Sequence, residues 1–368
     1  MNLKNVFLFG AIIMIALSSC KKDVIDDPSN GGGGTVSADV TLVGGSPTEF
    51  ASVDNTNPLT ARFYDPKQLL WHHKTNALYV LDAYGTTYLR KVDQTGVSTV
   101  APYTFGLHNE AFDIAMASDA AGSLLVTTSL GKLMKLDPTV PISATNPSII
   151  IDRLNSNGFP KAENAVGSLD VASIDGGYGL AVIDANTLYF SSSYLKTIRK
   201  VNFANVGNEV TAFAGKPTGS VADPAWPLAD GTGEQATFGV INDMTADNNG
   251  NIYVADPGYK VIRKITPSAR VTSFLTPTSN TQSFYLDADG TLTTAKARNI
   301  KHVAVSQDGK RLFFSSNSLL RLALPDENRV VTIAQFKESI NGIAVTPDGK
   351  KVYVTSGYAV YKVENIKY

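Results

Sequence analysis

The sequence has little of the material from which active centres are usually built. Its 368 residues include one cysteine and four histidines, and its net charge is −1. A single cysteine excludes an intramolecular disulfide. The balanced charge provides no concentrated basic surface of the kind that phosphate backbones require, so we predict no nucleic-acid partner. The histidines have no recurring metal-ligand spacing, and we predict neither a metal nor a cofactor; they are His72, His73, His108 and His302.

Catalytic fingerprints and helical patterns are also missing. The chain contains no nucleophile elbow, phosphate loop or dinucleotide motif, and we therefore predict no catalytic residue. No segment shows a sustained helical period, which favours an all-β fold. What recurs instead is a short apolar strand core, preceded by a turn with Asn, Asp or Gly. The six copies are ALYVLD from Ala77, SLLVTT from Ser123, TLYFSS from Thr187, NIYVAD from Asn251, RLFFSS from Arg311 and KVYVTS from Lys351.

Each core lies within a larger repeated unit of four strands. An apolar strand precedes most cores, and a third strand such as VIRKIT and a fourth such as VTSFLT follow. Six such units predict a six-bladed β-propeller of four-stranded antiparallel blades. The last unit ends after its third strand at Tyr368, while an unassigned strand lies at Ala38 to Gly45. We expect this N-terminal strand to complete the last blade, because closing the ring removes an exposed sheet edge.

The N-terminus has the pattern of a targeting segment. Lys4 precedes an apolar run from Val6 to Leu17, which is short for a membrane span of about 20 residues. The LSSC that ends at Cys20 resembles the lipobox of bacterial lipoproteins, and CKKD resembles the start of lipoproteins from the Bacteroidetes group. We therefore expect a signal peptide at 1–19, a lipidated Cys20 with a flexible tether at 20–37, and the propeller at 38–368. The resemblance implies an outer-membrane lipoprotein, with surface exposure as one option.

The stretch from Ala229 to Leu275 is similar to an NHL repeat. It carries a Phe before the inner strand, Gly-Asn before IYVAD, and IRKI afterwards. The unit from Ala61 to Val100 looks like a second copy, with Phe63 and Pro66 in the expected places. Four further units match mainly by position. The resemblance implies an NHL-type six-bladed propeller over nearly the whole mature chain.

Acidic and basic residues recur at two of these units. Asp256 lies seven residues before Arg263, across one tight loop, and Asp82 and Arg90 occupy comparable places. Residues on neighbouring antiparallel strands can meet side by side. We therefore predict two structural ion pairs, Asp256–Arg263 and Asp82–Arg90, which would fix the loop between the second and third strands.

Loops between second and third strands also carry aromatic residues. A tyrosine ring has an apolar face and a hydroxyl group, which suits sugars and peptides alike. Because specificity in a propeller resides in its loops, we predict a binding face for a protein, peptide or glycan ligand. The candidate residues are Tyr84, Tyr194, Tyr259, Tyr358 and Trp226, although packing over loop backbones is an equal alternative.

The starts of the inner strands define a second candidate region, the mouth of the central channel. Its predicted residues are Gln68, Phe112, Tyr178, Asn242, Lys301 and Asn341. Gluconolactonase-like hydrolases resemble this architecture and hold a divalent ion in the channel, and Glu110, Asp113 and Asp243 lie nearby in the sequence. Lys301 would repel such an ion. The sequence favours non-catalytic binding at the cell envelope, with a metal-dependent hydrolase or a purely architectural role as alternatives.

Overall fold

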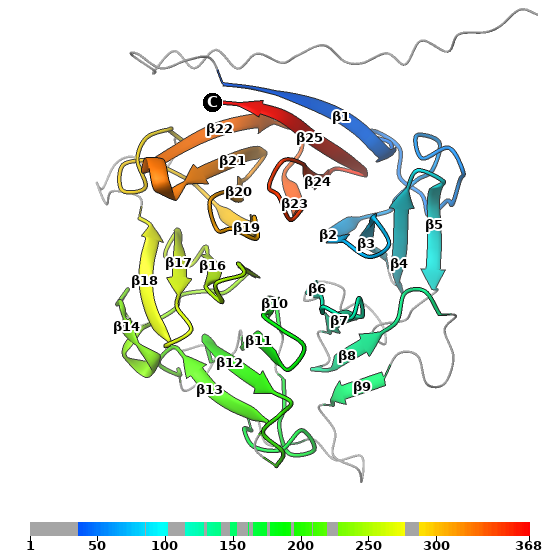
Figure 1. Cartoon of the computed structure of the whole chain (residues 1–368). Coiled ribbons are helices and arrows are strands. Elements are labelled where there is room, and N and C mark those ends of the chain that lie inside the picture. The colour runs from blue at the N-terminus through cyan, green and yellow to red at the C-terminus, as the bar shows by residue number, and fades with distance from the viewer. Residues whose placement is uncertain are drawn as a thin grey trace, which may run out of the picture.

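The computed structural model describes residues 36–84, 86–101, 115–128, 131–140, 148–152, 161, 165–174, 177–192, 195–207, 209–218, 227–276 and 287–368. Six antiparallel sheets follow one another around a central axis (Figure 1). The six-bladed β-propeller predicted from the repeats is confirmed. Cys20, the predicted signal peptide and nearly all of the predicted tether lie outside the described residues.

In each blade the inner strand is followed in sequence by its neighbours outward, except that the outermost strands of blades 4 and 6, β14 (Gly231–Thr232) and β1 (Ser37–Gly45), come from earlier in the chain. Blade 1 consists of β2 (Pro66–His72), β3 (Ala77–Tyr84), β4 (Thr86–Asp93) and β5 (Gly96–Ala101). Blade 2 consists of β6 (Met116–Ser118), β7 (Leu124–Thr127), β8 (Leu133–Leu136) and β9 (Ser148–Ile151). Blade 3 consists of β10 (Leu180–Val182), β11 (Thr187–Ser192), β12 (Thr197–Asn202) and β13 (Val210–Ala214).

The second half of the ring repeats this pattern. Blade 4 consists of β15 (Asp243–Ala246), β16 (Ile252–Asp256), β17 (Val261–Ile265) and β18 (Arg270–Leu275), with β14 (Gly231–Thr232) added at its outer edge. Blade 5 consists of β19 (Ile300–Val305), β20 (Leu312–Ser316), β21 (Leu319–Leu324) and β22 (Arg329–Gln335). Blade 6 consists of β23 (Ile340–Val345), β24 (Val352–Ser356), β25 (Ala359–Lys367) and β1 (Ser37–Gly45). Two single turns of 3-10 helix, η1 (Gly233–Gln235) and η2 (Pro325–Glu327), lie in connections.

The strand cores recur because every blade meets two neighbours. All five residues of β16, from Ile252 to Asp256, are buried, although successive side chains point to opposite faces of the sheet. Tyr253 and Ala255 pack toward blade 5, while Ile252 and Val254 pack with Tyr189 of blade 3. Both faces of a central strand must therefore be apolar. No helix in the described part of the chain has the length and apolar character needed to cross a bilayer.

Ring closure is made by the N-terminal strand. β1 runs antiparallel to β25, with Ser37 opposite Lys367, Val40 opposite Val363 and Gly45 opposite Ala359. Ala38 is buried in the core that blades 5 and 6 share. The closing strand predicted from the sequence is confirmed, and Figure 1 shows it as the outermost strand beside the C-terminus.

Gly45 ends this closing strand in a conformation that other residues rarely adopt. Its φ is +80°, and a Cβ atom there would lie 2.4 Å from the carbonyl oxygen of Tyr358 and 2.7 Å from Phe63. We expect Gly45→Ala to lower the free energy of unfolding by about 2 kcal/mol or more, through backbone strain and overpacking. The neighbouring Gly44→Ala is the control, because its Cβ would meet only ordinary contacts of 3.5 Å or longer. Urea unfolding of both variants measures the difference, and equal midpoints would contradict it.

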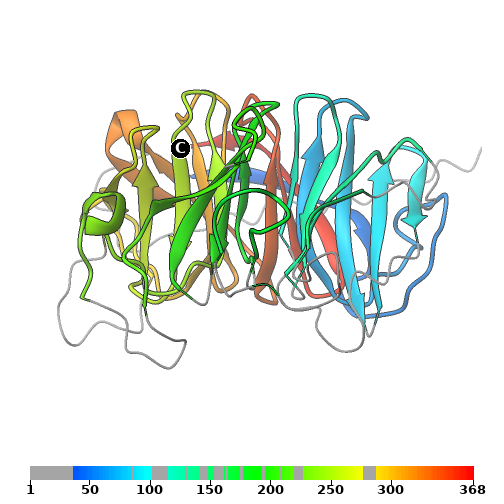
Figure 2. The same cartoon turned by 90° about the horizontal axis from the view of Figure 1, so that it is seen from below.

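The propeller has two faces, and Figure 2 shows the ring edge-on between them. We call the face where the inner strands begin the loop face. It carries the loops between second and third strands and the connections from one blade to the next. The opposite turn face carries the hairpins between first and second strands. On the turn face adjacent hairpins are bonded together: Asn248 N–H donates to Gln307 O at 2.9 Å, and Gln307 N–H donates to Pro347 O at 2.9 Å.

Candidate functional site: the central channel and the loop face

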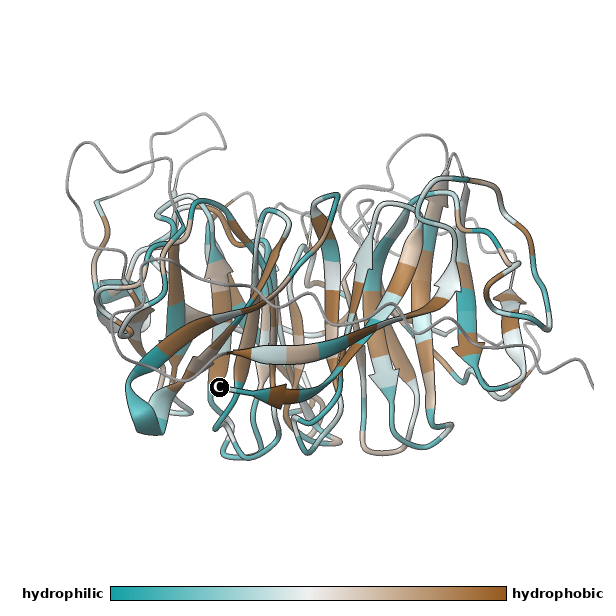
Figure 3. Ribbon diagram, turned by 90° about the horizontal axis from the view of Figure 1, so that it is seen from above, coloured by the Kyte–Doolittle hydropathy of each residue, from teal (hydrophilic) through white to brown (hydrophobic). Residues whose placement is uncertain are grey.

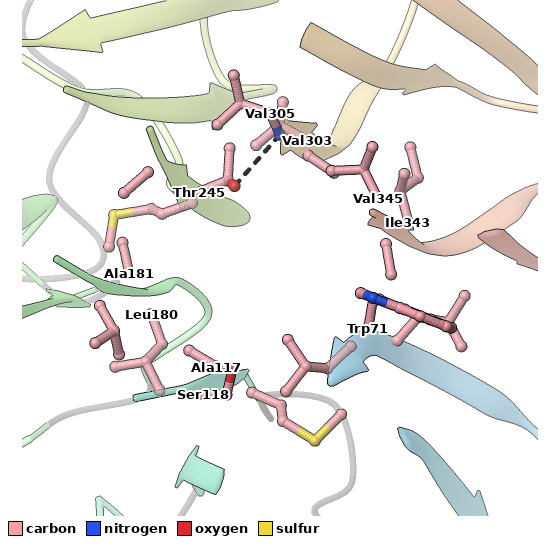
Figure 4. A pocket seen from close by; sticks show the side chains of 18 of the residues that line it. Trp71, Ala117, Ser118, Leu180, Ala181, Thr245, Val303, Val305, Ile343 and Val345 are labelled. Carbon is pink, nitrogen blue, oxygen red and sulfur yellow. Dashed lines mark hydrogen bonds between the residues drawn. The ribbon is translucent and has the colours of Figure 1, made fainter. Parts of the chain in front are cut away.

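The inner strands surround a central cavity of about 220 Å³ (Figure 4). All six of them contribute to it, which are β2, β6, β10, β15, β19 and β23. Small and apolar side chains dominate the wall, including Ala117, Ala181, Val305 and Val345. On one side the indole of Trp71 stacks on Tyr353, with ring centroids 5.4 Å apart and planes inclined by 3°. Gln68, His73 and Asp243 also line this space, which is therefore of mixed polar and apolar character.

Most polar contacts at the channel hold blades together. Asp243 is buried, and its Oδ1 accepts a hydrogen bond from Met244 N–H at 2.8 Å. Its Oδ2 accepts one from Val303 N–H of the next blade at 3.1 Å and lies 3.5 Å from Nδ1 of His302. The hydroxyl of Thr245 is 3.4 Å from Val305 N–H, as the dashed line in Figure 4 shows. These groups link blade 4 to blade 5.

The described residues contain no group of three His, Cys, Asp or Glu side chains placed to bind a metal ion together. Glu110 and Asp113, which the sequence places near the channel, lie outside the described residues. Asp243, the carboxylate that is described, already bonds two backbone N–H groups. In the described part of the chain, this carboxylate links blade 4 to blade 5.

The structure separates the predicted mouth residues. Gln68 lines the channel, whereas Asn242 extends to the next blade, where its Nδ2 donates to Lys301 O at 2.9 Å. The Lys301 side chain is exposed, and Tyr178 and Asn341 are half-buried at the starts of their inner strands. Phe112 lies outside the described residues. Among the described mouth residues, Asn242 and the backbone of Lys301 thus form a hydrogen bond between blades 4 and 5.

The structure describes the side chains of only two of the five aromatic residues predicted for the binding face. Tyr259 is half-buried, its backbone N–H donates to Asp256 Oδ1 at 3.2 Å, and burial raises the pKa of its hydroxyl. Tyr358 is half-buried on the loop face next to the closing strand. Tyr84 ends β3, but its side chain is not described, and Tyr194 and Trp226 lie outside the described residues.

Tyr358 belongs to an aromatic cluster that sequence reasoning missed. Phe50 lies between it and Tyr64, with ring centroids 5.3 Å from Tyr358 and 5.1 Å from Tyr64. Phe50 remains 54 % exposed, which is unusual for a phenylalanine held by two other rings. The sequence signal is a lone aromatic in the polar stretch SPTEFASVDNTNP. We call Phe50, Tyr64 and Tyr358 the seam cluster, because it spans the junction of blades 6 and 1.

Buried arginines hold the connections behind the loop face. Arg263 is fully buried under Phe238, with the guanidinium carbon 5.4 Å from the ring centroid. It donates to Thr237 O at 2.6 Å, to Ala229 O at 2.8 Å and to Asp230 Oδ1 at 2.8 Å. Burial lowers its pKa, and the charges of Asp230 and Asp256 oppose that shift. The arginine thereby fixes the connection that leads into blade 4.

The predicted Asp256–Arg263 ion pair requires a correction. Asp256 does not pair directly with Arg263; its carboxylate accepts backbone N–H groups from Gly239 and Val240, each at 2.9 Å. Burial raises the pKa of Asp256, and these hydrogen bonds oppose the increase. Arg263 turns instead toward Asp230, because the connection preceding the blade places carbonyl groups and a carboxylate within reach of one planar guanidinium.

In blade 1 the predicted ion pair between Asp82 and Arg90 does form. Arg90 Nη1 lies 3.1 Å from Asp82 Oδ2, and both side chains are fully buried. Arg90 also pairs with Asp54 at 2.8 Å and lies over Phe63 at 5.2 Å, so it reproduces the contacts of Arg263. Arg321 does the same in blade 5, where it pairs with Asp289 at 2.9 Å and donates to Ala288 O. A buried arginine over a phenylalanine ring is thus a repeated anchor for the connections in blades 1, 4 and 5.

Several solved structures are similar to this chain in fold. No family profile and no curated protein sequence matches the chain. An auxiliary nutrient binding protein from Bacteroides thetaiotaomicron aligns with a TM-score of 0.57 at 16 % identity, over 88 % of this chain and 75 % of that one. Another from Bacteroides ovatus gives 0.57 at 15 % identity, over 89 % and 76 %.

Two further structures extend the comparison. A Bacteroides thetaiotaomicron protein of unknown function aligns with a TM-score of 0.60 at 17 % identity, over 88 % of this chain and 75 % of that one. A protein provisionally named a gluconolactonase gives 0.52 at 11 % identity, over 90 % and 93 %. At these identities the likeness concerns the fold, which both binding proteins and an enzyme class share.

Proposed function

We propose that this protein is a lipid-anchored NHL-type propeller of the bacterial outer membrane that binds its ligand without chemical conversion on the loop face. The observation that carries the proposal is the seam cluster, in which Phe50 is 54 % exposed although two rings hold it in place. A preorganised aromatic surface can bind a sugar ring or an apolar peptide side chain at low entropic cost. Two nutrient-binding neighbours with the same fold support a binding role.

The lipid anchor is part of this proposal. Its support is the sequence before the propeller, in which the single Cys20 ends an LSSC stretch after an apolar run. The ligand classes that fit the loop face are a protein, a peptide or a glycan. A rigid ring supplies order, while the inter-blade connections determine specificity.

Binding can be tested with the labelled protein on arrays of defined oligosaccharides and peptides. We expect Phe50→Ala to weaken binding at least tenfold, about 1.4 kcal/mol, because the variant removes the exposed ring of the seam cluster. The melting temperature should change little, since the Phe50 side chain is more than half exposed.

Val206→Ala is the matched control, because it also shortens an exposed apolar side chain, 88 % accessible, but on the turn face. It should bind like the unmodified protein. Undiminished binding of Phe50→Ala to every array component that the unmodified protein recognises would overturn the proposed face. A change in both variants would show that the array detects non-specific adhesion.

A further inference from the structure

We infer that the turn face is directed toward the membrane and the loop face away from it. This inference rests on the proposed lipid anchor and adds an orientation to it. The decisive feature is the direction of β1, because this strand alone determines at which face the anchored segment joins the propeller.

The end of the chain locates the two faces. Tyr368 lies beside the hairpin of blade 6 that contains Gly349 and Lys350, and its hydroxyl is 3.4 Å from Arg311. Since β1 is antiparallel to β25 and pairs Ser37 with Lys367, the chain enters the propeller at this same turn face. The other end of β1 reaches the loop face, where Ser46 N–H bonds to Tyr358 O at 3.3 Å.

The length of the chain between Cys20 and β1 then limits how far the propeller can lie from the membrane. Cys20 precedes Ser37 by seventeen residues, and this segment contains four successive glycines. A random coil of seventeen residues has a root-mean-square span of about 23 Å, against a maximum of about 60 Å. The nine-residue β1 separates the faces by roughly 30 Å. Turning the loop face to the bilayer would require the segment to span these roughly 30 Å along the blade edge, which is more than its random-coil span and about half of its maximum length, whereas the opposite orientation needs no such extension.

The chemistry of the two faces agrees with this arrangement. The hairpins between first and second strands of blades 4 to 6, which lie on the turn face, are hydrophilic, as the teal colour of the turns nearest the C-terminus in Figure 3 shows. Their sequences include DNNGN at Asp247, QDGK at Gln307 and PDGK at Pro347. Such a surface suits contact with lipid headgroups and water rather than insertion. The exposed Phe50 and the inter-blade connections then point outward, where a ligand can reach them.

Fluorescence quenching on vesicles tests the orientation. The lipidated full-length protein is reconstituted in phosphatidylethanolamine–phosphatidylglycerol vesicles that contain headgroup spin-labelled lipid. Single labelled cysteines are placed at exposed sites on the turn face, Ala185→Cys and Lys350→Cys, and on the loop face, Val240→Cys and Ser339→Cys. We expect several-fold stronger quenching at Ala185 and Lys350. Lengthening the anchored segment with twenty Gly and Ser residues should remove the difference.

The outcomes separate the two proposals. Protein that does not float with the vesicles overturns the lipid anchor, and the orientation with it. Protein that floats but shows equal or stronger quenching at Val240 and Ser339 overturns the orientation alone, because the anchor would then be intact. An unchanged difference after lengthening the segment would also contradict the inference, since its length would not be what orients the propeller.

Discussion

A protein that begins at Ser46, and therefore lacks β1, is expected to lose the cooperative thermal unfolding of the closed ring. β1 forms seven residue pairs with β25 and buries Ala38. At about 1 kcal/mol for each hydrogen bond, the loss amounts to several kcal/mol before any apolar contact is counted. That is comparable with the 5–15 kcal/mol by which a typical domain is stable.

The matched control is a protein that begins at Val36, which lacks the entire N-terminal segment but retains β1. It should unfold at the same temperature as the longer chain, by circular dichroism and calorimetry. The shorter protein should also aggregate, because β25 would present an unpaired strand edge. A cooperative transition at an unchanged temperature in the protein that begins at Ser46 would show that the ring does not depend on this strand.

Replacing Arg263 by Ala is expected to have the second largest effect, a loss of about 3–5 kcal/mol in the free energy of unfolding. The variant leaves Thr237 O without its arginine donor, removes one of the two N–H groups that bond Ala229 O, and creates a cavity under Phe238. The stability of Arg263→Lys should lie between those of the unmodified protein and Arg263→Ala, because a single ammonium group cannot reproduce the planar fork that bonds both carbonyls and Asp230.

Chemical unfolding monitored by intrinsic fluorescence measures this loss. Arg270→Ala is the control, since it removes the same side chain from an exposed position in the next strand, β18, and should change stability by less than about 0.5 kcal/mol. The Asp230→Asn variant completes a double-mutant cycle with Arg263→Ala. Equal stabilities of Arg263→Ala and Arg270→Ala would mean that the buried guanidinium does not anchor the connection into blade 4.

The two ion-pair predictions show which contacts can be predicted from spacing along the sequence. The spacing of Asp82 and Arg90 across one hairpin was sufficient to predict their contact, because both residues lie in one blade. A comparable placement, seven residues apart instead of eight and also within one blade, failed for Asp256 and Arg263. There the competing partner, Asp230, comes from the connection before the blade, 33 residues earlier, and no hairpin pattern indicates where that connection runs.

The candidate site depends even more on long-range contacts. Phe50 and Tyr358 are more than 300 positions apart in the sequence, and their rings meet because β1 returns to the last blade. The closing strand was predictable from its likeness to other outer strands. The sequence did not predict that this strand leads residues 46–65 onto the loop face. It also did not predict that an aromatic residue is exposed there.

The sequence by itself determined the blade, its sixfold repetition and the use of an N-terminal strand for closure, because alternating apolar residues and turn residues act over a few positions. Only the tertiary structure decided which carboxylate each buried arginine meets, which aromatic rings gather at the junction of blades 6 and 1, and at which face the chain enters. Those outcomes depend on where six blades place their connections around one axis, and residues that are distant in sequence meet only once the ring has closed.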